Sequence, residues 1–178
     1  SGNVTNAQMQ QFMENSFAWL TQRDDLKTNT FKVAIAHLDE SYYFKDESSV
    51  RTWLDAHYPG KVSYNVANSC DDAQLATCIA ANPDLLIISQ IANAGSDVAA
   101  IAASVKTALQ QGIPVLYVHH DGGLTALGEK LLPLFNVTYQ WDNYWKKLGL
   151  KAFDVTSTLG KLPDNIRTIQ TMLTHFKA

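Results

Sequence analysis

Long apolar runs and charged residues are both scarce in this sequence of 178 residues, and each shortage excludes a class of protein. No run approaches the roughly 20 apolar residues that a membrane-spanning helix needs, so we expect no membrane span. Charged side chains make up 17% of the chain, the formal net charge is -3, and the lysines and arginines are scattered. The lack of a basic face argues against a nucleic-acid partner.

The hydrophobic share of 46% is sufficient for one well-buried domain, and the length favours a single domain over residues 1–178. Ser1-Gly2 resembles a cloning remnant, and nothing after it resembles a signal peptide. We therefore expect any export signal to lie outside this sequence. No internal repeat, low-complexity tract or linker divides the chain.

Only two cysteines are present, Cys70 and Cys78, and they lie eight positions apart. Two ligands without companions cannot complete a tetrahedral zinc site, so this pair does not predict one. On one straight helix the two residues would be about 12 Å apart, which is beyond the reach of a disulfide. A bridge therefore requires Cys70 to lie in the loop ahead of the helix. A local disulfide and two separate thiols are the alternatives.

Patterns typical of helices and strands alternate along the chain. Apolar residues at three- and four-residue intervals, with caps and stops, predict helices at 6–22, 47–58, 72–81, 96–112 and 124–135. Asp71 or Asp72 and Ser96 are the expected caps of the third and fourth helices. Apolar runs predict strands at 31–38, 62–67, 85–89 and 113–119. The segment 137–178 is looser, with an aromatic stretch and a last helix ending at Phe176.

This alternation predicts βαβ units, and hence a mainly parallel sheet with helices on both faces. We expect a three-layer, doubly wound α/β domain with flavodoxin-like strand order and the strand at 31–38 beside the switch point. Ligands bind such sheets at the carboxyl ends of the strands. The candidate ligand-binding residues are the polar groups at those ends: Asp39, Glu40, Tyr42, Gln90, Asn93, His119, His120 and Asp121.

Two kinds of chemistry can be drawn from these strand-end residues. His119, His120 and Asp121 could supply metal ligands with His37 and Asp39, but successive strand residues point to opposite faces. We therefore expect ordinary hydrogen-bonded histidines, with no metal and no other cofactor. A hydrolase triad could combine Ser89 or Ser41 with His119 and with Asp39 or Asp121. Neither serine, however, lies in a G-x-S-x-G elbow.

The stretches Pro83–Ile88 (PDLLII) and Gly112–Leu116 (GIPVL), with the helix between them, resemble class I glutamine amidotransferase-like domains. In that family the second strand leads to a cysteine nucleophile flanked by glycines. Here His119 occupies the cysteine position, and Tyr117 and Asp121 occupy the glycine positions. The family's late histidine two residues ahead of a glutamate is missing too. Because attack on a glutamine amide needs a thiolate and a base, the resemblance implies a degenerate domain without a catalytic residue.

The helix from Met9 to Leu20 ahead of such a domain, with a late tryptophan-rich segment, resembles an accessory domain of secreted bacterial enhancin-like zinc metallopeptidases. That mucin- and glycoprotein-cleaving group includes the immunomodulating metalloproteases. The resemblance covers residues 6–150, and the group's zinc-binding His-Glu-x-x-His motif is absent from this sequence.

The resemblance implies a non-catalytic binding or scaffolding domain, secreted or at the cell surface. Its expected partners are the other domains of the parent protein, or a glycan or glycopeptide. Secretion would favour a disulfide between Cys70 and Cys78. The alternative is a small stand-alone α/β hydrolase or amidotransferase-like enzyme with a strand-end Ser/His site.

Overall fold

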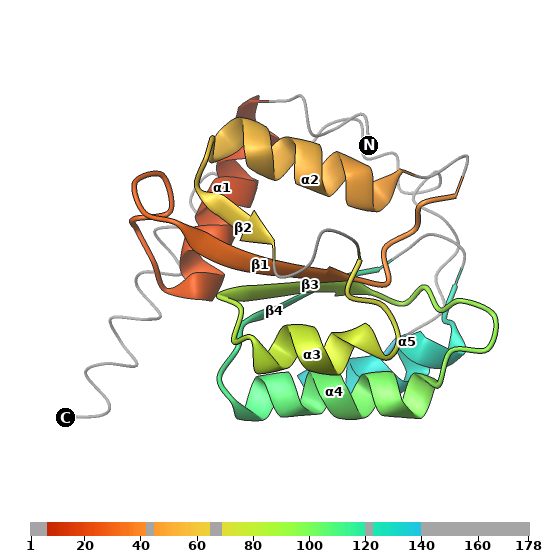
Figure 1. Cartoon of the computed structure of the whole chain (residues 1–178). Coiled ribbons are helices and arrows are strands. Elements are labelled where there is room, and N and C mark those ends of the chain that lie inside the picture. Colours follow the sequence, from red (N-terminus) through yellow and green to blue (C-terminus); the bar gives the residue numbers. More distant parts are fainter. Residues whose placement is uncertain (1–6, 42–44, 65–68, 120–122, 140–178) are drawn as a thin grey trace. The chain divides into compact units, whose positions relative to one another are not determined.

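The computed structural model describes residues 7–41, 45–64, 69–119 and 123–139 (Figure 1). The chain divides into two compact units, residues 18–141 and residues 2–17 with 142–178, and each is considered by itself. Helix α1 (Ala7–Thr21) contributes residues to both units. The predicted last helix and the aromatics after Tyr139 lie outside the described residues. The single domain expected over 1–178 therefore stays a prediction.

Residues 18–141 contain a sheet of four parallel strands: β1 (Phe31–Ala36), β2 (Val62–Tyr64), β3 (Leu85–Ser89) and β4 (Val115–Val118). Their order is β2-β1-β3-β4, which confirms the flavodoxin-like arrangement. The strand order reverses between β1 and β3, so the switch point lies at their carboxyl ends. The continuous apolar sequence of β3 is explained by its central position, because all five of its residues are buried.

Helices cover both faces of the sheet, which gives the predicted three layers (Figure 1). Helix α2 (Asp46–His57) lies on one face. Helices α3 (Gln74–Ala80), α4 (Val98–Gln110) and α5 (Ala126–Leu131) lie on the other, and a 3-10 turn, η1 (Leu132–Phe135), follows α5.

Successive residues of each strand point to opposite faces of the sheet, so they contribute to the hydrophobic cores on its two sides. Leu86 and Ile88 of β3 belong to the buried cluster that also contains Ile101 and Val105 of α4. On the other face Phe31 meets the ring of Tyr58, which follows α2, at 5.2 Å between centroids. Burying each such aliphatic or aromatic side chain stabilises the fold by about 1.5–3 kcal/mol. Most of the stability of this unit therefore comes from residues that the strand pattern already marks as apolar.

Strand and helix ends differ from the predictions for identifiable reasons. Strand β1 ends at Ala36 because His37 adopts a positive φ of 54°, which a strand cannot continue through. Helix α4 is capped by Asp97, whose carboxylate accepts hydrogen bonds from the backbone N–H groups of Ala99 and Ala100, so the prediction of Ser96 as cap is wrong. The N-cap of α3 is Ala73, so the prediction of Asp71 or Asp72 is also wrong.

The other boundaries shift by a few residues. Strand β4 begins at Val115 and ends at Val118, inside the predicted span 113–119. Helix α5 begins after Thr125, whose hydroxyl accepts from the Gly128 N–H, and the chain continues as η1 through Pro133. Strand β2 ends at Tyr64, and the rest of its predicted span lies outside the described residues.

Candidate functional site at the carboxyl edge of the sheet

His37 connects three segments at the switch point. Its side chain is buried, its Nδ1 lies 2.8 Å from the Ile91 carbonyl oxygen, and its Nε2 lies 3.1 Å from the Asp72 backbone nitrogen. A carbonyl oxygen only accepts and a backbone N–H only donates, so the ring must be neutral with its proton on Nδ1. One imidazole thus joins the end of β1 to the loop after β3 and to the segment that leads into α3.

Two further side chains satisfy the backbone where the chain leaves the sheet. The buried Ser89 hydroxyl donates to the His37 carbonyl and accepts from the Ile91 N–H at 3.2 Å. The Asp71 carboxylate accepts from the His37 N–H and from the Ser69 hydroxyl. Buried backbone groups need such partners, so these residues have a structural task at the switch point.

Cys70 and Cys78 form a disulfide, which decides between the two alternatives left by the sequence. The backbone N–H of Cys70 donates to the Ile35 carbonyl at 2.8 Å, whereas Cys78 belongs to α3. Cys70 therefore lies in the loop ahead of the helix, as the geometric argument requires. The bridge ties the segment containing Asp72 and Ala73 to the edge of the sheet.

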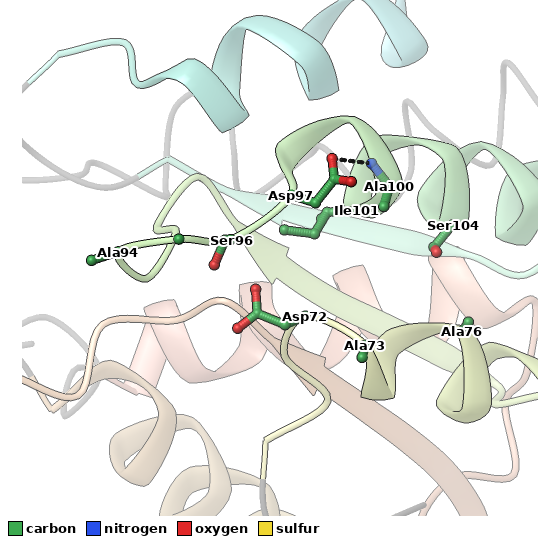
Figure 2. Close-up of a pocket in the computed structure, with 10 residues that line it drawn as sticks. Asp72, Ala73, Ala76, Ala94, Ser96, Asp97, Ala100, Ile101 and Ser104 are labelled. Atoms are coloured by element: carbon green, nitrogen blue, oxygen red, sulfur yellow. Dashed lines mark hydrogen bonds between the residues drawn. The ribbon is translucent and has the colours of Figure 1, made fainter.

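A pocket of about 440 Å³ opens between the starts of α3 and α4 (Figure 2). We call it the α3–α4 pocket. Its lining consists mostly of small side chains: Asp72, Ala73, Ala76, Ala94, Gly95, Ser96, Asp97, Ala100, Ile101 and Ser104. It lies at the carboxyl edge of the sheet because both of its walls begin with segments that leave strand ends.

Asp72 is the main charged group in this pocket. The Ser96 hydroxyl points toward the Asp72 carboxylate (Figure 2). Its hydrogen-bonding interaction with the ionised carboxylate is the largest effect on the pKa of Asp72, and it lowers that pKa. Partial burial opposes this effect, while Asn93 reinforces it. Asn93 donates from its amide to the Asp72 carboxylate at 3.4 Å. The carboxylate is thus ionised at neutral pH and held in place from several sides.

A second group of side chains lies at the end of β4, and we call it the His119 surface: Tyr117, His119 and Tyr139. The exposed His119 ring stacks on Tyr139 with 5.1 Å between centroids. Its Nδ1 lies 3.2 Å from the Tyr117 hydroxyl. Burial raises the pKa of Tyr117 to about 12, so its hydroxyl keeps its proton and can donate.

Gln90 is buried and holds the chain where it enters α5. Its amide donates to the Gly123 carbonyl at 2.7 Å, and its backbone carbonyl accepts from the Thr125 hydroxyl at 2.6 Å. Gly128 packs so closely that an added Cβ would lie 2.6 Å from the Gln90 Oε1. These contacts give Gln90 a structural role beside the His119 surface.

Asp39 and Glu40 stabilise the chain before α2. Glu40 accepts from both the backbone N–H and the hydroxyl of Ser48, and Asp39 accepts from the Ser41 N–H. Desolvation acts to raise the pKa of Glu40, but the Ser48 hydrogen bonds outweigh it and the pKa is lowered. Both carboxylates are therefore already engaged by nearby backbone groups.

The chain was compared with protein families, curated proteins and solved structures. The family described as the immunomodulating metalloprotease N-terminal domain matches residues 2–141. The chain belongs to this family. No curated protein and no solved structure matches it.

Membership of the immunomodulating metalloprotease N-terminal domain family confirms the predicted link to an accessory domain of a larger metallopeptidase. The match includes all four strands, the α3–α4 pocket and the His119 surface. Within the part of the chain that the structure describes, no helix is both long and apolar enough to cross a membrane. The resemblance to glutamine amidotransferase-like domains stays a prediction.

The predicted ligand-binding residues of this immunomodulating metalloprotease N-terminal domain do not form one group. Asn93 adjoins the α3–α4 pocket, His119 lies on its own surface, and Tyr42, His120 and Asp121 lie outside the described residues. In the described ranges no three His, Cys, Asp or Glu side chains are placed to hold a metal ion. Sequence reasoning missed Asp72 as a pocket residue, because its position at a helix start is also that of a cap.

Proposed function

We propose that this chain is a non-catalytic accessory domain of a larger secreted bacterial metallopeptidase that acts on mucin-like glycoproteins. The family match over residues 2–141 is the observation that carries the proposal, because the family is an N-terminal domain of metalloproteases. The sequence adds two supports. It contains no His-Glu-x-x-His motif, and His119 stands where an amidotransferase cysteine would be.

The geometry around Ser89 favours this function over a small hydrolase. A serine nucleophile needs its hydroxyl close to a histidine ring that removes the proton. The Ser89 hydroxyl is buried and donates instead to the backbone carbonyl of His37. His37 in turn has both ring nitrogens engaged with backbone groups. Neither residue is therefore available for acyl transfer in this arrangement.

The contact surface that we assign to this role is the His119 surface. Its stacked imidazole and phenol rings lie at the carboxyl edge, and the histidine is exposed. Aromatic faces of this kind stack on sugar rings or pack against a partner, and a single aromatic contact contributes about 0.5–1.5 kcal/mol beyond its buried area. A glycopeptide or another domain of the parent protein is the partner we propose.

Secretion is supported by the disulfide between Cys70 and Cys78. Bridges of this kind persist in oxidising compartments and are rare where thiols are kept reduced. The proposal therefore places the domain outside the cell or at its surface, where mucin-like glycoproteins are met.

NMR titration of the isotope-labelled chain tests the proposal. We expect a mucin-type O-glycopeptide, or the remainder of the parent protein, to shift the signals of Tyr117, His119 and Tyr139. His119→Ala should abolish the shifts. Gln111→Ala, an exposed change beyond the last turn of α4, should leave them intact.

The unglycosylated form of the same peptide separates sugar recognition from peptide recognition. If neither the glycopeptide nor the remainder of the parent protein perturbs the His119 surface, the domain is a spacer and the binding part of the proposal is wrong. Turnover of a peptide or glutamine substrate by the purified chain would contradict the non-catalytic part.

A further inference from the structure

The α3–α4 pocket has walls suited to an aliphatic chain. Ala73 and Ala76 form one side, while Ala100 and Ile101 of α4 form the other (Figure 2). Methyl groups on both sides leave a hollow of about 440 Å³ that no larger side chain of the lining occupies. An apolar stem placed there would lose contact with water on both sides, and such burial is favourable by about 0.8 kcal/mol for each methylene group.

The polar side of the pocket is acidic. Asp72 keeps 41% of its side chain exposed, and Asp97 is the second carboxylate of the lining. No lysine, arginine or histidine is among the lining residues. The start of α4 contributes about half a positive charge at most, which leaves the pair of carboxylates in excess.

The pocket is also a poor site for an anion, because its two carboxylates would repel one and its possible donors are occupied. The backbone N–H groups of Ala99 and Ala100, which an anion would use at the start of α4, are occupied by the Asp97 carboxylate. The Nε2 of His37 lies 4.0 Å from the Asp72 Oδ1, but it accepts a hydrogen bond from the Asp72 N–H, so the ring carries no charge in this arrangement. The pocket therefore favours a positive charge.

Two acceptor atoms in the pocket have unfilled hydrogen-bonding capacity. The Oδ1 of Asp72 and the Oγ of Ser96 are shielded from solvent, and apart from the interaction of these two side chains with each other neither atom has a hydrogen-bond partner in the described structure. The two side chains point toward each other (Figure 2). Buried polar atoms are seldom left in this condition, so a donor entering between α3 and α4 would be stabilised there.

We propose that the α3–α4 pocket binds the side chain of a lysine or arginine presented by a protein partner. The aliphatic stem lies between the alanine walls, and the ammonium or guanidinium group contacts the exposed part of the Asp72 carboxylate. The Ser96 hydroxyl turns to accept a second hydrogen bond. This site is distinct from the His119 surface and does not depend on the function proposed for that surface.

Blocked pentapeptides with a central lysine, arginine, glutamine or glutamate test the proposal on the full chain. The lysine and arginine peptides are expected to give saturable shifts of the Ala73, Ala76 and Ala100 amide signals at millimolar concentration. Glutamine and glutamate peptides are expected to give none. Signals from the His119 surface should not move, so this result is separable from the glycopeptide titration.

Two variants identify the contacts. Asp72→Asn removes the charge and should weaken the lysine peptide about fivefold to tenfold, the range expected for a partly exposed ion pair with a hydrogen bond. Ala76→Leu fills the hollow, suits a helix and keeps the charge, so it should abolish binding even if Asp72→Asn disturbs the loop. Asp24→Asn removes an exposed carboxylate outside the pocket and should change nothing.

The proposal is overturned if the lysine and arginine peptides give no saturable shifts. It is equally overturned if the glutamine peptide binds as well as the lysine peptide, or if Asp72→Asn and Ala76→Leu leave the binding unchanged.

Discussion

Replacing Cys70 and Cys78 together by alanine is expected to destabilise the sheet-bearing unit and to loosen the α3–α4 pocket. The disulfide closes a loop that contains Asp72, Ala73 and Ala76, three of the residues lining that pocket. Cross-linking a loop of about nine residues removes roughly 2.5 kcal/mol of chain entropy from the unfolded state at 25 °C. Reduction of the unchanged chain should therefore lower the free energy of unfolding by about 2.5 kcal/mol.

The double alanine variant should lose more than reduction alone. Both cysteines are buried, with 2% and 1% of their surface exposed, so shortening them also removes packing contacts. Each lost sulfur is comparable to a buried methylene group, worth about 0.8 kcal/mol before any cavity cost. We expect the variant to be about 4 kcal/mol less stable than the oxidised chain.

Urea denaturation followed by tryptophan fluorescence measures these differences, because Trp53 is buried beside Tyr58. The oxidised chain, the reduced chain and Cys70→Ala/Cys78→Ala are compared, and reductant added to the double variant controls for effects unrelated to the bridge. In NMR spectra the Ala73 and Ala76 signals should broaden on reduction while those of β3 stay sharp. A difference below about 0.5 kcal/mol between the oxidised and reduced chains would refute the loop-closure argument.

Two other residues give further predictions. His37→Ala leaves the Ile91 carbonyl and the Asp72 N–H without their partner, and each unsatisfied buried group costs about 1–3 kcal/mol. In urea denaturation we expect His37→Ala to lower the free energy of unfolding by at least about 2 kcal/mol, and the exposed control Thr107→Ala to lower it by almost nothing. Equal stability of the two variants would contradict the linking role of His37. Asp25 has its pKa lowered to about 2, first by its hydrogen bond from Arg23 and then by Asn29. Its contribution to stability is therefore complete above pH 4 and is lost as the pH falls toward 2. Between about pH 4 and pH 2 the melting temperature should fall less steeply for Asp25→Asn than for the unchanged chain, whereas Asp24→Asn should show the same fall as the unchanged chain. Identical slopes for both variants would contradict the pairing of Asp25 with Arg23.

The sheet could be predicted from the sequence because hydrophobic periodicity is a local property. Residues 85–89 read as a buried strand and are one, and alternation of strands with helices requires parallel pairing and right-handed crossovers. The cysteine spacing likewise determined that a bridge would place Cys70 outside the helix. These conclusions need only the chain's own geometry over a few residues.

The contacts of polar residues at strand ends could not be predicted, because the sequence shows that a side chain is polar without showing what it contacts. Gln90 and Glu40 are predicted ligand-binding residues, and only the structure shows that each also has hydrogen bonds with backbone groups of a neighbouring segment. Ser96 and Asp97 are both acceptable caps by residue type, and only the backbone conformation of Asp97 decides between them.

The site itself depends on contacts between residues distant in sequence. His37 meets Asp72 across 35 positions and Ile91 across 54, and these two contacts join the end of β1 to the segment before α3 and to the loop after β3. The α3–α4 pocket exists because the parallel sheet returns each strand to the same edge, where loops from different strands must share their hydrogen-bonding groups. Composition and periodicity determined that such an edge would form, and tertiary packing alone decided that an aspartate and a serine would face each other there.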